Sequence, residues 1–128
     1  MSNEFVTHGA FSWHELMTTD VAAAKRFYRE LFNWDTETAP MPGTDYVVIK
    51  VAGNSVGGMM ALPPEMKGMP PSWSLYITVK DVDATARKVT ELGGRILRPP
   101  QDIPKVGRFC VLQDPQGAVL CAITYAEM

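Results

Sequence analysis

Two stretches of the chain carry apolar residues at helical spacing. Asp20 begins the first, DVAAAKRFYRELFN, and Asp81 begins the second, DVDATARKVTELGG. An aspartate is a favourable N-cap, and Gly93 suits the C-terminal end of the second stretch. The apolar faces comprise Val21, Ala24, Phe27, Tyr28, Leu31 and Phe32 in the first stretch and Val82, Ala86, Val89 and Leu92 in the second. The pattern predicts two amphipathic helices, each packed on another element through these faces.

Short apolar-rich segments before and after each helix predict strands. One strand precedes each helix, at 10–18 and 73–80. Three extended segments follow each helix, at 35–38, 46–52 and 55–62 in the first half and at 95–97, 107–113 and 118–125 in the second. Gly53-Asn54 and the loop Asp114 to Gly117 (DPQG) are good hairpin signals. Each half therefore has the order strand-helix-strand-strand-strand.

The two halves repeat at a spacing of 61 residues. Asp20 matches Asp81, and Leu31 matches Leu92. An Asp-Val pair at a helix start is common, so coincidence is the alternative, but it does not explain the matched order of five elements. We therefore expect a single α+β domain over residues 1–128, made of two tandem βαβββ modules. The first module spans 8–62, a linker spans 63–72 and the second module spans 73–126, and the two modules form a shared cleft.

Composition and charge narrow the function classes. Apolar residues make up 46% and charged residues 20% of the 128, as in globular proteins. A net charge of −2 argues against nucleic-acid binding by phosphate neutralisation. Glycines and a proline interrupt the longest uncharged run, 51–64, so we expect no membrane span. With no secretory signal at the N-terminus and no CxxC zinc motif, we expect a cytoplasmic protein.

The paired modules resemble the vicinal oxygen chelate superfamily, which includes glyoxalases, bleomycin-resistance proteins and extradiol dioxygenases. The resemblance rests on FSWHELMTTDVAAAKRFYRELFNW in the first half, and on WSLYITVKDVDATARKVTELGG with FCVLQDPQGAVLCAI in the second. It implies the βαβββ fold over nearly the whole chain. It does not select a reaction, because one fold supports many functions.

Many members of this superfamily bind a divalent metal ion through His, Gln or Glu side chains of the outer strands of each module. The family's first-strand ligand lies seven residues before the helix-capping aspartate, which here is Trp13 or Ser74. Its last-strand ligand lies seven residues after the aspartate of DPxG, which here is Cys121. Residues 55–62 contain no His, Gln, Asp or Glu. We therefore expect no metal site of the family type and no cofactor.

Strand alternation assigns the side chains to two faces. If Leu75, Ile77 and Val79 face the helix, then Ser74, Tyr76 and Thr78 face the cleft. By the repeat, Trp13, Glu15 and Met17 also face the cleft, whereas His14 faces the helix side as a partly buried, hydrogen-bonded structural residue. The expected ligand-binding residues are Trp13, Glu15, Met17, Met59, Ser74, Tyr76, Thr78, Arg108 and Cys121.

Glu15 is the most informative of these residues. A carboxylate in mid-strand must be paired, solvated or shifted in pKa. It could bind a cationic group or act as a general base with Tyr76 as its partner, or it could form a structural ion pair, for which Arg108 is a candidate. We expect Glu15 to be the main polar anchor of the cleft.

Two pairs of residues in the strands have alternative interpretations. If DPQG is a four-residue loop, Gln113 pairs with Ala118 and Cys110 lies opposite Cys121, which would allow a cross-strand disulfide or a thiol pair. Small buried apolar residues are the favoured interpretation. Gly57-Gly58 within a strand indicates a bulge or a close approach of the backbone.

These observations favour a metal-free protein that binds an aromatic or amphipathic small molecule, or a metal-independent enzyme. The alternative is a divalent-metal-dependent lyase or dioxygenase of the glyoxalase type. The resemblance also implies a homodimer. A small-molecule ligand is thus the expected partner, with no nucleic acid and no membrane.

Overall fold

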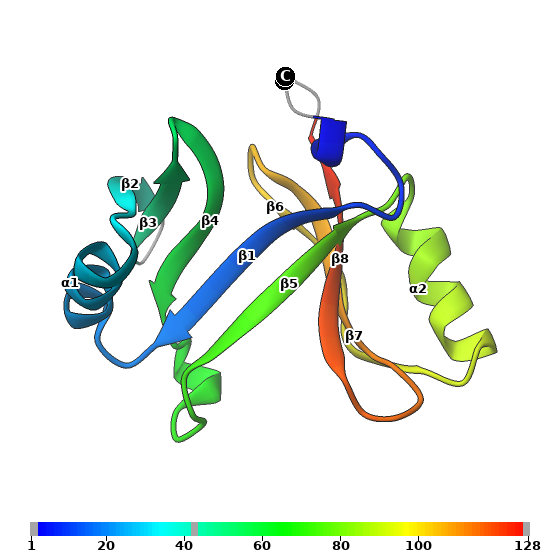
Figure 1. Cartoon of the computed structure of the whole chain (residues 1–128). Coiled ribbons are helices and arrows are strands. Elements are labelled where there is room, and N and C mark those ends of the chain that lie inside the picture. The colour runs from blue at the N-terminus through cyan, green and yellow to red at the C-terminus, as the bar shows by residue number, and fades with distance from the viewer. Residues whose placement is uncertain (1–2, 42–43, 127–128) are drawn as a thin grey trace. The chain divides into compact units, whose positions relative to one another are not determined.

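A computed structural model of the chain describes residues 3–41 and 44–126. Its elements follow the predicted order and are shown in Figure 1. The first half holds β1 (Phe11–Thr18), α1 (Val21–Phe32), β2 (Asp35–Met41), β3 (Thr44–Val51) and β4 (Asn54–Ala61). The second half holds β5 (Ser72–Thr78), α2 (Val82–Glu91), β6 (Arg95–Ile103), β7 (Gly107–Gln113) and β8 (Val119–Tyr125). Short 3-10 helices lie at Asn3–Phe5 and Pro64–Met66.

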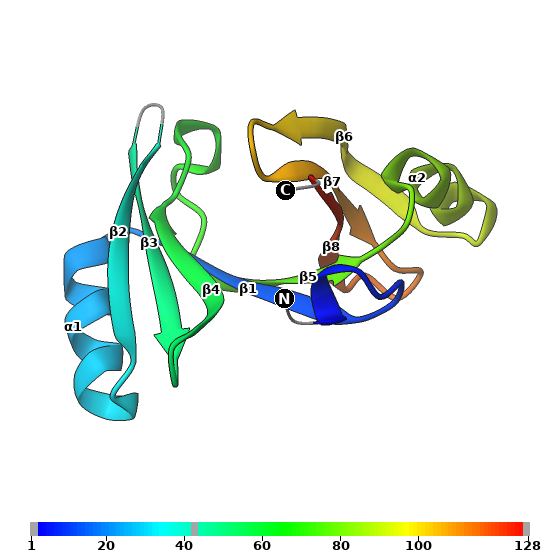
Figure 2. The same cartoon turned by 90° about the horizontal axis from the view of Figure 1, so that it is seen from above.

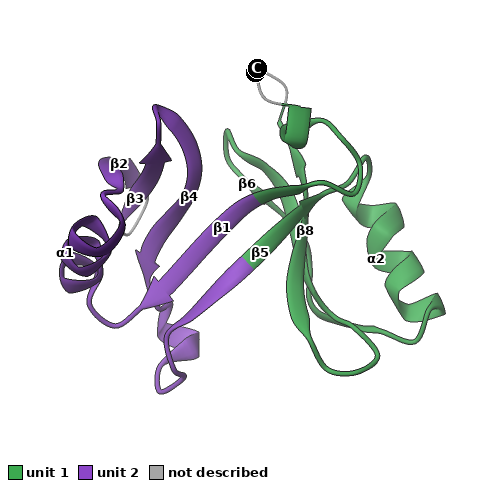
Figure 3. Ribbon diagram, in the orientation of Figure 1, with its two compact units in different colours: residues 1–12, 75–128 green, residues 13–74 purple. Residues whose placement is uncertain are grey.

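The chain is an α+β protein, and its strands and helices belong to two compact units. Residues 13–74 form one unit and residues 1–12 with 75–128 form the other (Figure 3). The strand order is β2-β3-β4-β1 in the first and β5-β8-β7-β6 in the second. In both units the first strand runs parallel to the last strand of its half, and the hairpins are antiparallel. The predicted module boundaries, 8–62 and 73–126, and the cleft between the modules stay predictions.

The two helices start where the sequence predicts. The carboxylate of Asp20 accepts a hydrogen bond from the backbone N–H of Ala23 at 3.0 Å, and Asp81 accepts one from Ala84 at 3.1 Å. Each bond satisfies one of the N–H groups that a helix start leaves without a partner in the helix. The two aspartates that match in the sequence repeat therefore cap their helices in the same way.

Each helix covers one face of the sheet in its own unit, as Figure 2 shows from above. In residues 13–74 the buried core consists of Leu16, Val47, Ile49 and Met59, with Val21, Ala24 and Tyr28 of α1 packed against it. In the other unit, Val82 and Ala86 of α2 pack with Val79, Cys110 and Ala122.

One sequence-based expectation for α1 is wrong. Phe27, Leu31 and Phe32 were expected to pack inward, but they are 57%, 56% and 54% exposed. No residue of α1 is fully buried, whereas α2 buries Val82 and Ala86. The sheet therefore covers only part of the apolar face of α1, and these three side chains are left on the surface.

Candidate functional site

The side chains of β1 alternate between the two faces of the sheet as predicted. Leu16 lies in the core beneath α1, so Trp13, Glu15 and Met17 lie on the opposite face. Tyr46 of β3 lies on this opposite face too, because its neighbour Val47 is part of the α1 core. We call the side of β1, β3 and β4 that faces away from α1 the open face.

Glu15 takes part in a short hydrogen-bond chain on the open face. The indole Nε1–H of Trp13 donates to the hydroxyl of Tyr46 at 2.9 Å, and this hydroxyl donates to Oε1 of Glu15 at 2.7 Å. An indole N–H can only donate, so the hydroxyl hydrogen of Tyr46 is directed to the carboxylate. The chain therefore orients Glu15 as an acceptor, which suits a ligand group that donates hydrogen bonds or carries positive charge.

Gly58 makes this chain possible. In the parallel pairing of β1 with β4, Glu15 lies opposite Gly58. A Cβ atom built on Gly58 would overlap the phenol ring of Tyr46, and one built on Gly57 would overlap the carbonyl oxygen of His14. The paired glycines thus allow the close approach that the sequence indicated, and β3 and β4 also show a register irregularity at Ile49/Lys50. Sequence analysis missed Tyr46, although the glycine pair was a signal for a neighbour of this kind.

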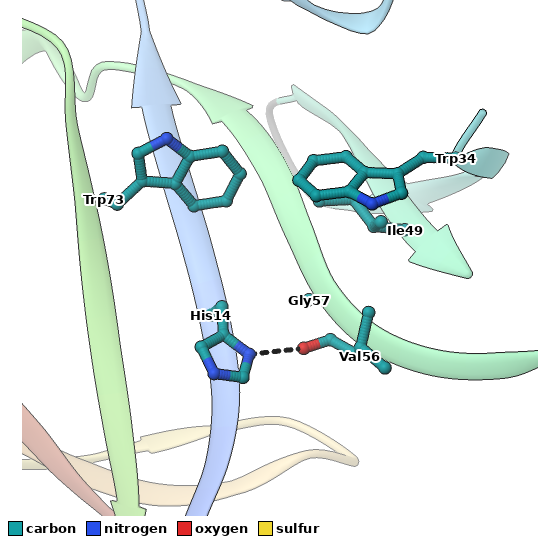
Figure 4. Close-up of a pocket in the computed structure, with 6 residues that line it drawn as sticks. All are labelled: His14, Trp34, Ile49, Val56, Gly57 and Trp73. Carbon is teal, nitrogen blue, oxygen red and sulfur yellow. Dashed lines mark hydrogen bonds between the residues drawn. The ribbon is translucent and has the colours of Figure 1, made fainter. Parts of the chain in front are cut away.

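His14 lies on the α1 side of β1, as expected from strand alternation. Its Nδ1 lies 2.9 Å from the carbonyl oxygen of Val56, and since a carbonyl only accepts, this nitrogen carries the hydrogen. The side chain is hydrogen-bonded as predicted, but it is exposed rather than partly buried. It borders a hollow of about 250 Å³ that Trp34, Ile49, Val56, Gly57 and Trp73 also line (Figure 4).

The structure corrects the expected position of Met59. Its side chain is 0% exposed and packs with Leu16, Val47 and Ile49 beneath α1. Parallel register pairs Met59 with Leu16, so it cannot lie beside Glu15 on the open face. Met59 is a core residue of this unit.

Arg108 is also placed differently from its expected position. Its guanidinium binds both carboxylate oxygens of Asp83 on α2, at 3.0 and 3.1 Å, and Asp102 of β6 at 3.1 Å. Arg108 therefore lies on the α2 side of its sheet. These ion pairs hold the pKa of Asp83 below and that of Arg108 above the usual range, chiefly through the hydrogen bonds between the two side chains. Arg108 thus connects α2 to β6 and β7, and its predicted contact with a ligand stays a prediction.

The remaining predicted residues belong to different units. Ser74 lies with Trp13, Glu15 and Met17 in residues 13–74, whereas Tyr76, Thr78 and Cys121 lie in the other unit. There Tyr76 pairs with Cys121 across β5 and β8, and both side chains are buried. The hydroxyl of Thr78 donates to the backbone carbonyl of Glu4 at 2.6 Å, so the N-terminal segment covers Thr78. Of the predicted residues, Trp13 and Glu15 are thus brought together through Tyr46.

The cysteine register differs from the expectation by one residue. Gln113 pairs with Val119, which places Cys110 opposite Ala122 and Cys121 opposite Val111. The two thiols therefore point to opposite faces. Both are buried, and neither is part of a disulfide. Burial raises the pKa of the Cys110 thiol. The predicted interpretation as small buried residues agrees with this geometry, and the cross-strand pair does not.

Trp13, at the family's ligand position in β1, does not supply a donor atom for a divalent metal ion. At the position in β1, the Nε1–H of Trp13 is engaged as a donor to Tyr46 and offers no lone pair. Among residues 3–41 and 44–126, no group of three or more His, Cys, Asp or Glu side chains is arranged to hold a metal ion. We therefore derive no step through a metal ion.

No helix within the described ranges is long and apolar enough to cross a membrane.

Comparison with known proteins shows the family. Residues 10–122 match the model of the Glyoxalase/Bleomycin resistance protein/Dioxygenase superfamily. The chain is 41% identical over 115 residues to "Putative glyoxylase CFP32" of Mycobacterium bovis and 32% identical over 123 residues to "Anthracycline biosynthesis protein DauV" of Streptomyces sp.. These alignments cover 88% and 86% of the chain but 44% and 45% of the two relatives, so the chain spans less than half of their length.

Solved structures show the same fold at low sequence identity. Methylmalonyl-CoA epimerase from Mycobacterium tuberculosis superposes with a TM-score of 0.69 at 18% identity, over 99% of this chain and 93% of that one. The hypothetical protein BH1468 from Bacillus halodurans superposes with a TM-score of 0.74 at 12% identity, over 95% and 98%. Together, the family match, the relatives and the fold show that the chain belongs to the glyoxalase/bleomycin resistance protein/dioxygenase superfamily.

Proposed function

We propose that the chain binds a small aromatic molecule that carries a cationic or hydrogen-bond-donating group, and that Glu15 on the open face anchors this group. The observation that carries the proposal is the directed chain from Trp13 through Tyr46 to Glu15. The carboxylate of Glu15 accepts a hydrogen bond from Tyr46, which in turn accepts one from Trp13. Glu15 thus supplies one placed polar group beside aromatic side chains, and ligand sites usually combine a few such groups with apolar surfaces.

One relative, DauV, supports this chemical class. DauV takes part in anthracycline biosynthesis, according to its name. Amino-sugar anthracyclines combine a flat aromatic ring system with an ammonium group, and these are the two features that Trp13 and Glu15 would recognise. An ammonium group beside a carboxylate forms a charge-assisted hydrogen bond, which is stronger than a neutral one.

The test compares a cationic probe with a matched neutral probe. Purified chain is titrated with an amino-sugar anthracycline, such as daunorubicin, and with its aglycone, and binding is followed by the fluorescence of the ligand. We expect the cationic probe to bind at least about tenfold more tightly, since a charge-assisted bond contributes roughly 1.5–3 kcal/mol. Glu15→Gln should remove this preference and Tyr46→Phe should weaken it.

Glu91→Gln, an exposed carboxylate of α2, is the matched control and should bind like the wild type. Equal affinity for the two probes in the wild type would contradict the role of Glu15. The absence of binding to either probe would contradict the aromatic ligand class.

Catalysis by Glu15 with Tyr76, homodimerisation and a cytoplasmic location stay predictions. A pH profile of turnover would test the first, once a substrate is identified.

A further inference from the structure

Residues 3–8 lie across the sheet that α2 covers, on its other face, and we call them the strap. Val79 packs in the core beneath α2, so the side chain of its neighbour Thr78 lies on the opposite face of the sheet. There the hydroxyl of Thr78 donates to the backbone carbonyl of Glu4 in the strap at 2.6 Å. Figure 2 shows the strap, in dark blue, and α2 on opposite sides of β8. The strap and this sheet belong to one compact unit.

Hydroxyl groups gather where the strap meets the sheet. The ring of Phe5 lies edge-on to that of Tyr125, with 5.1 Å between the centroids. The hydroxyl of Tyr125 lies 2.8 Å from that of Ser12, and both Ser12 and Thr78 are buried. Burial raises the pKa of the Tyr125 phenol, the hydrogen bond with Ser12 opposes this, and the charge of Glu4 adds to it. Release of the strap would uncover the ring of Tyr125 and the hydroxyl of Thr78, which is one of the predicted ligand-binding residues.

His8 connects the strap to the segment between β5 and α2. The backbone N–H of Lys80 donates to Nδ1 of His8 at 3.0 Å. A backbone N–H only donates, so Nδ1 offers a lone pair and the ring is neutral, with its hydrogen on Nε2. Once the imidazole gains a proton, both ring nitrogens are donors and Nδ1 can no longer accept. Two donors would then face each other, and this contact is lost.

Gly9 lets the chain turn from the strap into β1. Its φ is +92°, in the left-handed region that favours glycine, and a Cβ atom built there would meet no atom beyond its chain neighbours within 4 Å. The N–H of Gly9 donates to the carbonyl of Thr78 at 2.7 Å, and the N–H of Thr78 donates to the carbonyl of Ala10 at 2.9 Å. These bonds attach the base of the strap to β5, so the strap can be released while β1 stays in place.

The charged groups around His8 do not bind its imidazole. The carboxylate of Asp81 caps α2, and that of Asp83 binds Arg108. Within residues 3–41 and 44–126, His8 forms no ion pair. Carboxyl groups gain a proton near pH 4, whereas histidine changes its charge between about pH 5 and 8. A change in the strap above about pH 5.5 therefore reports on the imidazole. The charged groups on the elements around it are Glu4 of the strap, Lys80 and Asp81 before α2, and Asp83 in the first turn of α2.

We propose that the strap is a pH-sensitive cover: protonation of His8 breaks its bond to Lys80 and releases residues 3–8 from the sheet. The neutral imidazole holds the strap closed above neutral pH. As the pH falls, the open form gains population, and Thr78 and Tyr125 become accessible. The strap and Glu15 belong to different units, so this cover acts independently of the ligand site proposed above.

Nuclear magnetic resonance of the full chain at about pH 7.5 and pH 5.5 tests the proposal. The protection of the Lys80 N–H against hydrogen exchange is taken relative to the intrinsic exchange rate at each pH. In the wild type this protection should fall at least about threefold on acidification, as for the loss of one neutral hydrogen bond. The nuclear Overhauser contact between the rings of Phe5 and Tyr125 should weaken in parallel, because the strap leaves the sheet.

Two variants at His8 separate the acceptor from the rest of the side chain. His8→Asn keeps an acceptor oxygen near the position of Nδ1 at every pH, so the strap should stay closed and lose its pH dependence. His8→Ala has no acceptor and should show weak protection of Lys80 at both pH values. His14→Asn changes the other histidine of the chain and is the matched control, which should behave like the wild type.

Several results would overturn the proposal. Equal protection of Lys80 at the two pH values in the wild type would show that His8 does not respond to pH. An unchanged pH dependence in His8→Ala, or its loss in His14→Asn, would assign the response to another group. A ring contact between Phe5 and Tyr125 that persists while Lys80 loses protection would show that the bond breaks without release of the strap. If His8→Ala does not fold, His8→Asn decides between the same outcomes.

Discussion

Tyr46 reaches Glu15 across a position in β4 that has no side chain. Gly58 is an ordinary strand residue whose φ is not positive, so its backbone does not require glycine. The requirement comes from the phenol ring of Tyr46, which occupies the space of a Cβ atom. Packing around the site, and not backbone conformation, therefore explains why glycine stands at this position.

Gly58→Ala should consequently destabilise the chain through Tyr46. We expect a loss of about 1–3 kcal/mol in the free energy of unfolding, as for other substitutions that overfill a packed site. Urea denaturation measures this loss. In a Tyr46→Ala background the same substitution should cost much less, because the overlapping ring is gone, and an equal cost in both backgrounds would refute this explanation.

The two cysteines should behave as separate buried thiols. Cys110 and Cys121 point to opposite faces and are 0% and 5% exposed. A thiol reagent should therefore react with neither residue quickly in the native chain and with both after denaturation in the absence of a reductant. Detection of fewer than two thiols in denatured protein would indicate a disulfide and contradict the register.

The cysteine register also shows why part of the site could not be predicted from the sequence. The DPQG signal correctly located the turn, but hairpin register depends on which backbone groups close the loop. Here the N–H of Asp114 donates to the carbonyl of Ala118, which shifts every pair by one residue. In contrast, the faces of Trp13, Glu15 and Leu16 were predictable, because alternation along one strand needs no knowledge of its partner.

At the scale of elements, Arg108 connects α2 to the β6–β7 hairpin. It binds Asp83 of α2 and Asp102 of β6 from its position on β7. The hydrogen bond from Arg108 is the largest cause of the lowered pKa of Asp83, and the charge of Arg108 adds to it while partial burial opposes it. A carboxyl group with a lower pKa in the folded chain than in the unfolded chain stabilises the fold at neutral pH.

The stability of the wild type should therefore decrease as the pH falls through the acidic range. The contribution of Asp83 is complete above the usual aspartate pKa of about 3.9 and is lost as the pH falls through the lower folded value. Arg108→Met should reduce stability at pH 7 and flatten this acid dependence. Urea unfolding midpoints between about pH 6 and pH 2.5 measure both effects. Arg95→Met, on the same hairpin, should keep the wild-type slope, and a wild-type slope in Arg108→Met would contradict the assignment.

Most elements were predictable, whereas the side chains that an element leaves on the surface were not. The N-caps Asp20 and Asp81 bond to backbone groups of their own helices. Their positions can therefore be predicted from the local sequence alone. The apolar face of α1 includes Phe27 and Leu31, but periodicity cannot tell how much of a face the sheet beneath will cover. Their exposure depends on how α1 lies against the core of its unit, and the sequence of the helix alone does not specify this.

At the scale of the whole molecule, the hydrogen bond of Trp13 leads to a prediction about the metal content of the purified chain. Trp13 occupies a position where metal-binding members of the family have a ligand, and its N–H is committed to Tyr46. Elemental analysis after incubation with Zn²⁺, Ni²⁺, Mn²⁺ or Fe²⁺ should therefore find well under one ion per chain. A stoichiometric ion would contradict this interpretation and favour the metal-dependent alternative.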